Sequence, residues 1–130
     1  VNIGAGTTTS NLKLTYNTIS TKSTLSNESV KTNQQFLGSV FGDHVKVGIQ
    51  SSFNCGTYIN SCSSLFGVNT HASYIPSFTW GERDQYVNQD IVSFIESSER
   101  MMQRREQLFS DDEKYVLKAL HAKTIQTASI

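Results

Sequence analysis

The sequence predicts a mainly β domain built from a repeating six-residue unit and followed by two α-helices. Three observations predict it. Apolar residues recur every six positions in the first part of the chain, the composition changes abruptly near residue 80, and the apolar spacing beyond that point is helical. The 130 residues suit one domain with an appendage.

The six-residue repeat is clearest in the middle of the chain. The apolar residues in phase are Phe41, Val47, Phe53, Ile59 and Leu65. A helix favours apolar recurrence at three and four residues and a half-buried strand favours alternation, so neither explains this period. A parallel β-solenoid does, because each short side points one residue inward and a turn follows it.

Small, polar and hydroxyl residues fill the rest of each repeat. The residues directly after the apolar position are Gly42, Gly48, Asn54, Asn60 and Phe66. We expect the Gly and Asn residues among them to form corners with positive φ. The fifth residues of the repeats are Val45, Ser51, Thr57, Ser63 and Asn69. We expect the side chains of Ser, Thr and Asn to hydrogen-bond to the neighbouring turn of the solenoid.

Residues 12–35 interrupt the period. Their apolar side chains are Leu12, Leu14, Tyr16, Ile19, Leu25 and Val30, in a background rich in Ser, Thr and Asn. The first three alternate with polar residues, which predicts a β-hairpin or a long loop inserted into the solenoid. This insertion is either a surface feature without a role or a segment that folds over a ligand or a neighbouring subunit.

The composition divides the chain into two parts. Residues 1–80 hold 24 Ser and Thr but only four Lys and no Arg, whereas residues 81–130 hold seven basic and nine acidic side chains. We therefore place the β-solenoid at residues 1–81, a helical cap at 82–123 and a tail at 124–130.

The helical cap is predicted from apolar spacing and from one capping motif. The first apolar stripe comprises Val87, Ile91, Phe94, Ile95 and Met102. Ser110 to Glu113 form a capping box, and a second stripe at Val116, Leu117 and Leu120 follows it. We expect one long helix, then a shorter one that frays from Thr124.

The overall composition gives no sign of nucleic-acid or membrane binding. The formal net charge is zero, no apolar run is long enough to span a membrane, and no secretory signal opens the chain. Cys55 and Cys62 do not have the spacing of zinc ligands, so we expect reduced thiols and predict no metal site. These features favour a cytoplasmic protein. The chain starts without Met inside an apparent strand, which suggests a fragment.

Three motifs resemble a known family. They are Asn2 to Asn11, Gly42 to Gly48, and Pro76 to Gly81. Together they are similar to the C-terminal domain of bifunctional sugar-1-phosphate nucleotidyltransferase/acetyltransferases, and more closely to an N-acetylglucosamine-1-phosphate uridyltransferase-like branch common in Bacteroidetes-type bacteria. The resemblance implies a single-stranded left-handed parallel β-helix, a homotrimer, and active sites between subunits that transfer acetyl from acetyl-CoA to an amino-sugar 1-phosphate.

The resemblance also implies roles for individual residues. Asn2 matches a residue that contacts the sugar phosphate, and Asn11 matches an Asn near the acetyl group, which we group with the catalytic residues. Ala5, Ile49 and Gly67 match positions that line the groove for acetyl-CoA, although Ile49 replaces a small polar side chain.

Several further residues are candidates with competing interpretations. Lys13 and Lys46 are expected either to meet the substrate phosphate or to be ordinary surface charges. His44 is the candidate base within this chain, or a solvated turn residue. Trp80, with Phe78, is either a platform for adenine or, more in keeping with its size, a buried anchor.

Two other histidines, His71 and His121, are interpreted as structural or surface residues. The family's own base precedes the Asn2 motif, and the nucleotidyltransferase domain, which would bring magnesium, is absent from this sequence. The alternative to an acetyltransferase is therefore a non-catalytic trimerisation or regulatory domain of a sugar-1-phosphate nucleotidyltransferase.

Overall fold

A computed structural model of the whole chain describes residues 1–23 and 28–128, with side chains as far as Ile125. The chain forms two compact units, Val1–Val87 and Asn88–Ile130. We call them the β unit and the helical unit and describe each by itself. The β unit extends past Gly81, where we placed the end of the solenoid.

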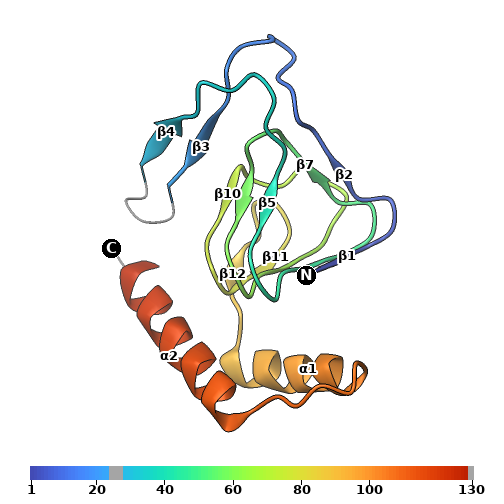
Figure 1. Cartoon of the computed structure of the whole chain (residues 1–130), viewed down its shortest axis with the longest axis vertical. Coiled ribbons are helices and arrows are strands. Elements are labelled where there is room, and N and C mark those ends of the chain that lie inside the picture. Colours follow the sequence, from blue (N-terminus) through green and yellow to red (C-terminus); the bar gives the residue numbers. More distant parts are fainter. Residues whose placement is uncertain (24–27, 129–130) are drawn as a thin grey trace. The chain divides into compact units, whose positions relative to one another are not determined.

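The β unit consists of short strands in three mostly parallel sheets and one antiparallel hairpin (Figure 1). The first sheet contains β1 (Asn2–Ile3), β6 (Lys46–Val47), β9 (Ser64–Leu65), β11 (Thr79–Gly81) and β12 (Val87–Asn88). The second contains β2 (Thr8–Thr9) and β7 (Ser52–Phe53). The third contains β10 (Tyr74–Ile75), β8 (Tyr58–Ile59) and β5 (Val40–Phe41). The hairpin contains β3 (Ser20–Lys22) and β4 (Ser29–Lys31).

The chain visits the three sheets in turn, so strands that pair are separated by one full circuit. Lys46 pairs with Ser64, 18 residues further on, and Val40 pairs with Tyr58 at the same interval. This register stacks the predicted apolar positions. Val47, Phe53, Ile59 and Leu65 are buried in one core, and Phe41 packs against it. The six-residue apolar period therefore marks the core, as the sequence predicts.

The turns between sheets fall into three groups, which we call corners. The first corner follows the first sheet (residues 4–7, 48–51 and 66–69), the second follows the second sheet (residues 10–12, 54–57 and 71–73), and the third follows the third sheet (residues 42–45, 60–63 and 76–78). Positive φ occurs at regular positions in them, at His44, Gln50, Gly56 and Cys62.

These positions correct our expectation for the Gly and Asn residues that follow each apolar residue. Gly42 and Gly48 do not have positive φ. They are small because neighbouring turns approach closely: a Cβ on Gly42 would lie 2.7 Å from the backbone nitrogen of Ser61. Gly4 is similar, since a Cβ there would lie 2.5 Å from the backbone of Gly48 and Ile49.

Hydroxyl side chains join successive turns, as predicted. Ser51 is buried, and its Oγ donates to the carbonyl of Gly67 one circuit further on, at 3.4 Å. The buried Ser63 Oγ donates to the carbonyl of Pro76 at 2.8 Å. These side-chain hydrogen bonds satisfy backbone carbonyls at the corners, where strand pairing does not satisfy them.

The insertion contains the predicted hairpin, but the hairpin is not formed by the alternating residues at its start. Ser20 pairs with Lys31 and Lys22 with Ser29 in antiparallel register, whereas Leu14 is 99% exposed. Ile19, just before β3, is the apolar residue of this segment that is buried. Leu25, which we assigned to the same segment, lies outside the described residues.

The helical unit contains α1 (Ile91–Gln103) and α2 (Asp111–Ala128). The capping box is confirmed, because Ser110 Oγ accepts the Glu113 N–H at 3.2 Å and Glu113 Oε2 accepts the Ser110 N–H at 2.8 Å. Two expectations were wrong: Val87 belongs to β12 rather than to the first helix, and α2 is the longer helix and continues past Thr124.

Candidate functional site

The first corner brings together three residues that lie far apart in the sequence. Ala5, Ile49 and Gly67 occupy equivalent positions in successive turns. The backbone N–H of Gln50 donates to the Ala5 carbonyl at 2.9 Å, which fixes the first two turns to each other. Ala5 is exposed and Ile49 is 66% exposed, so these positions present backbone and an aliphatic side chain to solvent, as does the neighbouring Val68.

The carboxylate of Glu82 borders the same corner. Gly67 has φ +96°, and a Cβ placed there would lie 2.6 Å from Glu82 Oε2. Gly67 therefore keeps its small size for two reasons, a left-handed backbone conformation and the approach of the Glu82 side chain. Sequence reasoning did not identify Glu82, because its place is set by the turn that follows β11.

Asn2, to which the resemblance gives a substrate role, and Lys46, a candidate for the substrate phosphate by its charge, are neighbours on the first sheet. They are register partners on β1 and β6. Asn2 is exposed, whereas Lys46 is half-buried with its Nζ withdrawn from solvent. Burial lowers the pKa of Lys46, and the nearby Cys62 partly opposes this. Lys46 is thus not an ordinary solvated surface charge.

Asn11 and Lys13 lie at the start of the insertion, by the second corner. The carbonyl of Asn11 accepts the Leu37 N–H at 2.9 Å, where the chain leaves and rejoins the sheets. Lys13 Nζ donates to the carbonyl of Thr18 at 2.8 Å, so its ammonium helps to close the loop in which it lies.

His44 lies at the third corner, with φ +57° and a half-buried side chain. Ala5, Asn11 and His44 therefore occupy three different corners of the β unit. A single chain does not gather the candidate base, the candidate acetyl-binding amide and the candidate donor groove in one place.

Trp80 differs from its interpretation as a buried anchor. Its side chain is 46% exposed, and its ring meets the Phe66 ring edge-on at 5.4 Å. Phe78 is instead the buried residue of the pair. The outward position follows from register, because Trp80 pairs with Ser64 while its neighbour Gly81 pairs with the buried Leu65.

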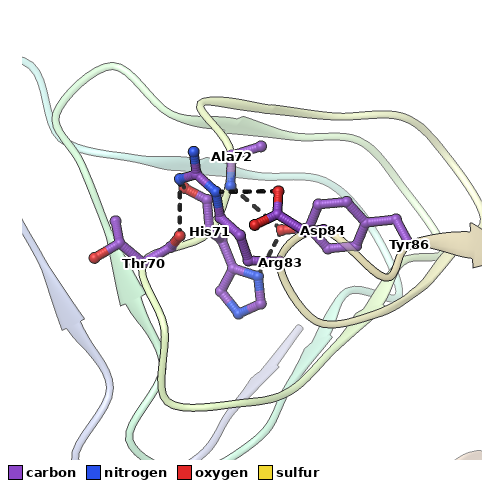
Figure 2. A network of polar contacts seen from close by, with 6 residues as sticks. All are labelled: Thr70, His71, Ala72, Arg83, Asp84 and Tyr86. Carbon is purple, nitrogen blue, oxygen red and sulfur yellow. Dashed lines mark hydrogen bonds and ion pairs between the residues drawn. The ribbon is translucent and has the colours of Figure 1, made fainter.

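A polar network closes the last circuit of the β unit (Figure 2). The imidazole of His71 is 1% exposed, stacks on Phe53 at 4.9 Å, and has its Nδ1 2.8 Å from the hydroxyl of Tyr86. Arg83 donates to the Thr70 carbonyl at 3.0 Å. His71 is therefore structural, as interpreted, while Tyr86 and Arg83 carried no signal in the sequence, since only the fold brings them to His71.

The hydrogen-bond partners of Tyr86 indicate which atoms of this network carry protons. The Ala72 N–H donates to Tyr86 Oη at 3.3 Å, so we place the Tyr86 proton on His71 Nδ1. Burial and, secondarily, the charge of Arg83 lower the pKa of His71, which keeps the ring neutral. Burial raises the pKa of Tyr86, which keeps its hydroxyl protonated. His71 Nε2 is buried without a hydrogen-bond partner among the residues that the structure describes.

The thiols and carboxylates do not form a metal centre in the described part of the chain. No group of three or more His, Cys, Asp or Glu side chains is placed to hold an ion there. Cys55 and Cys62 are free thiols, and burial raises the pKa of Cys62 to about 11, so this thiol stays protonated near neutral pH.

Two further findings bear on identity. Neither helix, within the residues described, is long and apolar enough to cross a membrane. Comparison with protein-family models and with curated proteins gave no match to this chain.

Proposed function

We propose that the β unit is a left-handed parallel β-helix of the acyltransferase type. Its reaction is acetyl transfer from acetyl-CoA to the amine of an amino-sugar 1-phosphate, as part of sugar-nucleotide synthesis in the cytoplasm. The parallel sheets, the 18-residue circuit and the motifs that contain Asn2 and Gly42 support this proposal.

The stacking of Ala5, Ile49 and Gly67 at the first corner is the observation that carries the proposal. Ala5 was singled out by resemblance, and Ile49 and Gly67 by counting six-residue repeats forward to the positions that the family uses; the register of β1, β6 and β9 aligns all three. Small residues leave backbone groups accessible there, which suits a groove for the extended pantetheine arm. Ile49 narrows this groove at its middle turn.

The chemistry needs a base and donors to the developing negative charge. The amine nitrogen attacks the thioester carbonyl carbon, the carbon–sulfur bond breaks as the amide forms, and the proton lost by the amine leaves the thiol of coenzyme A protonated. The Asn11 amide is our candidate donor to the oxyanion, His44 our candidate base, and Lys46 with Lys13 our candidates for the sugar phosphate.

Because these groups lie at three corners of one chain, we propose that the site forms between copies in a homotrimer. Neighbouring copies then contribute different corners to the same site. The proposed step uses side chains of the β unit, and magnesium would belong to the chemistry of a nucleotidyltransferase domain.

Calorimetric titration of acetyl-CoA into the full chain tests the proposal. We expect saturable binding. Ile49→Glu should raise the Kd about tenfold or more, which corresponds to roughly 1.4 kcal/mol, because a carboxylate there repels the phosphates of acetyl-CoA. Leu14→Glu adds the same charge to an exposed side chain of the insertion and is the matched control. Release of coenzyme A thiol with glucosamine 1-phosphate would then report catalysis.

A second candidate function is a trimerisation or regulatory module without chemistry. The separation of Ala5, Asn11 and His44 onto three corners favours it, because the isolated chain has no complete site. If a folded trimer shows no heat of binding with acetyl-CoA, the acetyltransferase proposal is wrong and this one stands.

A further inference from the structure

A small cleft lies between the inserted hairpin and the sheets of the β unit. Its volume is about 210 Å³. The residues that line it are Ser20, Thr21, Lys22, Ser29, Gly56 and Ser73. It opens at the second corner, away from the stack of Ala5, Ile49 and Gly67, so it is separate from the groove proposed above.

The hairpin is fixed in place over this cleft. Ile19 is 1% exposed, and its Cγ2 would lie 2.5 Å from a Cβ on Gly56, which has φ +70°. Thr21 Oγ1 donates to the Gly56 carbonyl at 2.9 Å. Lys22 Nζ lies 4.7 Å from the centre of the Tyr74 ring, a cation–π contact. These three attachments hold β3 and the residue before it, so the cleft is preformed rather than a gap under a loose loop.

The lining offers several uncommitted hydrogen-bond donors. Within the described residues, the hydroxyls of Ser20, Ser29 and Ser73 make no side-chain hydrogen bond, and Lys22 makes no ion pair. No carboxylate lines the cleft. Glu28, beside Ser29, is the acidic residue adjacent to it in the sequence.

The size and chemistry of the cleft define the ligand class. Sites for drug-sized ligands occupy about 300–1,000 Å³, so a cleft of this volume admits only a small molecule or a single group. A lysine and several serine residues in one lining favour an anion with several acceptor oxygens, and lysine is a common point-charge partner for phosphate.

We propose that this cleft binds a phosphate group, with Lys22 as its counter-ion and Ser29 and Ser73 as hydroxyl donors. The group is either inorganic phosphate or the phosphate of a small monoester. The insertion thereby has a role in binding, because β3 and β4 supply the cation and one hydroxyl while the second corner supplies the other.

Amide chemical shifts of the full chain, titrated with inorganic phosphate, test the proposal. We expect saturable shifts at Ser29, Gly56 and Ser73. Lys22→Gln should weaken binding by about tenfold or more, because a hydrogen bond to a charged group contributes about 1.5–3 kcal/mol. Lys31→Gln removes the same charge from β4, at a residue that does not line the cleft, and should change affinity by less than about twofold.

Further variants and ligands test the same site. Lys22→Arg retains the charge and the stacking on Tyr74 and should keep the site if Lys22→Gln disturbs the hairpin. Glu28→Gln should strengthen binding. Tighter binding of glucose 1-phosphate than of inorganic phosphate would identify a monoester as the ligand. Shifts that sodium chloride reproduces at equal ionic strength, or that persist unchanged in a folded Lys22→Gln variant, would overturn the proposal.

Discussion

At the scale of the residue, the β unit depends on a few side chains whose chemistry is set by where the fold buries them. His71 is the clearest case, because its ring is enclosed between Phe53 and Tyr86 while a neutral Nδ1 accepts the tyrosine hydroxyl. Protonation would place a charge in the core beside Arg83 and remove that acceptor. We therefore expect protonation of His71 to destabilise the network in Figure 2.

The stability of the β unit should consequently depend on pH through His71. Its folded pKa lies below the ordinary value of 6.5, so the unfolded chain binds more protons, and the free energy of unfolding falls as pH drops below that value. The contribution is fully present above about pH 6.5, and its slope below is at most ~1.4 kcal/mol per pH unit for one group. Urea unfolding from about pH 5 to 8 measures it.

Two variants separate this effect from other titrations. His71→Gln offers an amide oxygen to Tyr86 without titrating in this range, and it should flatten the His71 part of the profile. His121→Gln, in the helical unit, should leave it in place. An unchanged pH profile in folded His71→Gln would show that another group carries the dependence.

At the scale of the element, the spacing of apolar residues was sufficient to predict the sheets, because the 18-residue register puts every sixth residue in one core. The spacing of apolar residues did not predict the backbone conformation of the turns. Positive φ falls on His44, Gln50 and Cys62 as well as Gly56, and these residue types do not signal it. The glycines that did stand out must be small because the backbone of the neighbouring turn approaches them, and a single sequence does not display that approach.

A pair of glycines outside the left-handed region tests this explanation. Gly42→Ala would push a Cβ to within 2.7 Å of the Ser61 backbone nitrogen, so the turns must separate, and we expect a loss of about 1–3 kcal/mol. Gly38→Ala meets no atom within 4 Å and should instead stabilise the chain by about 0.4–1 kcal/mol, through the unfolded state. Urea denaturation of both variants measures the difference, and equal effects would contradict the close-approach argument.

At the scale of the whole molecule, most of the candidate site was predicted from the resemblance and from the count of six-residue repeats. Neither gave a reason to join Asn2 with Lys46, and parallel register supplied that pair. Tyr86, Arg83 and Glu82 escaped notice because they belong to a turn beyond the repeats. Their contacts form where the chain completes its last turn around the three sheets, and no repeating sequence pattern marks that place.

The proposed homotrimer is the feature on which the acetyltransferase depends. Ile49, Phe66, Val68 and Trp80 expose apolar surface at the first corner and on β11, and such clusters mark sites of association. Sedimentation should therefore give about three times the 14.5 kDa chain mass. Trp80→Glu should shift the distribution toward monomer, and Leu14→Glu should not. A chain that stays monomeric at every concentration would remove the second wall of the site, and with it both the acetyltransferase and the trimerisation module, since each requires neighbouring copies.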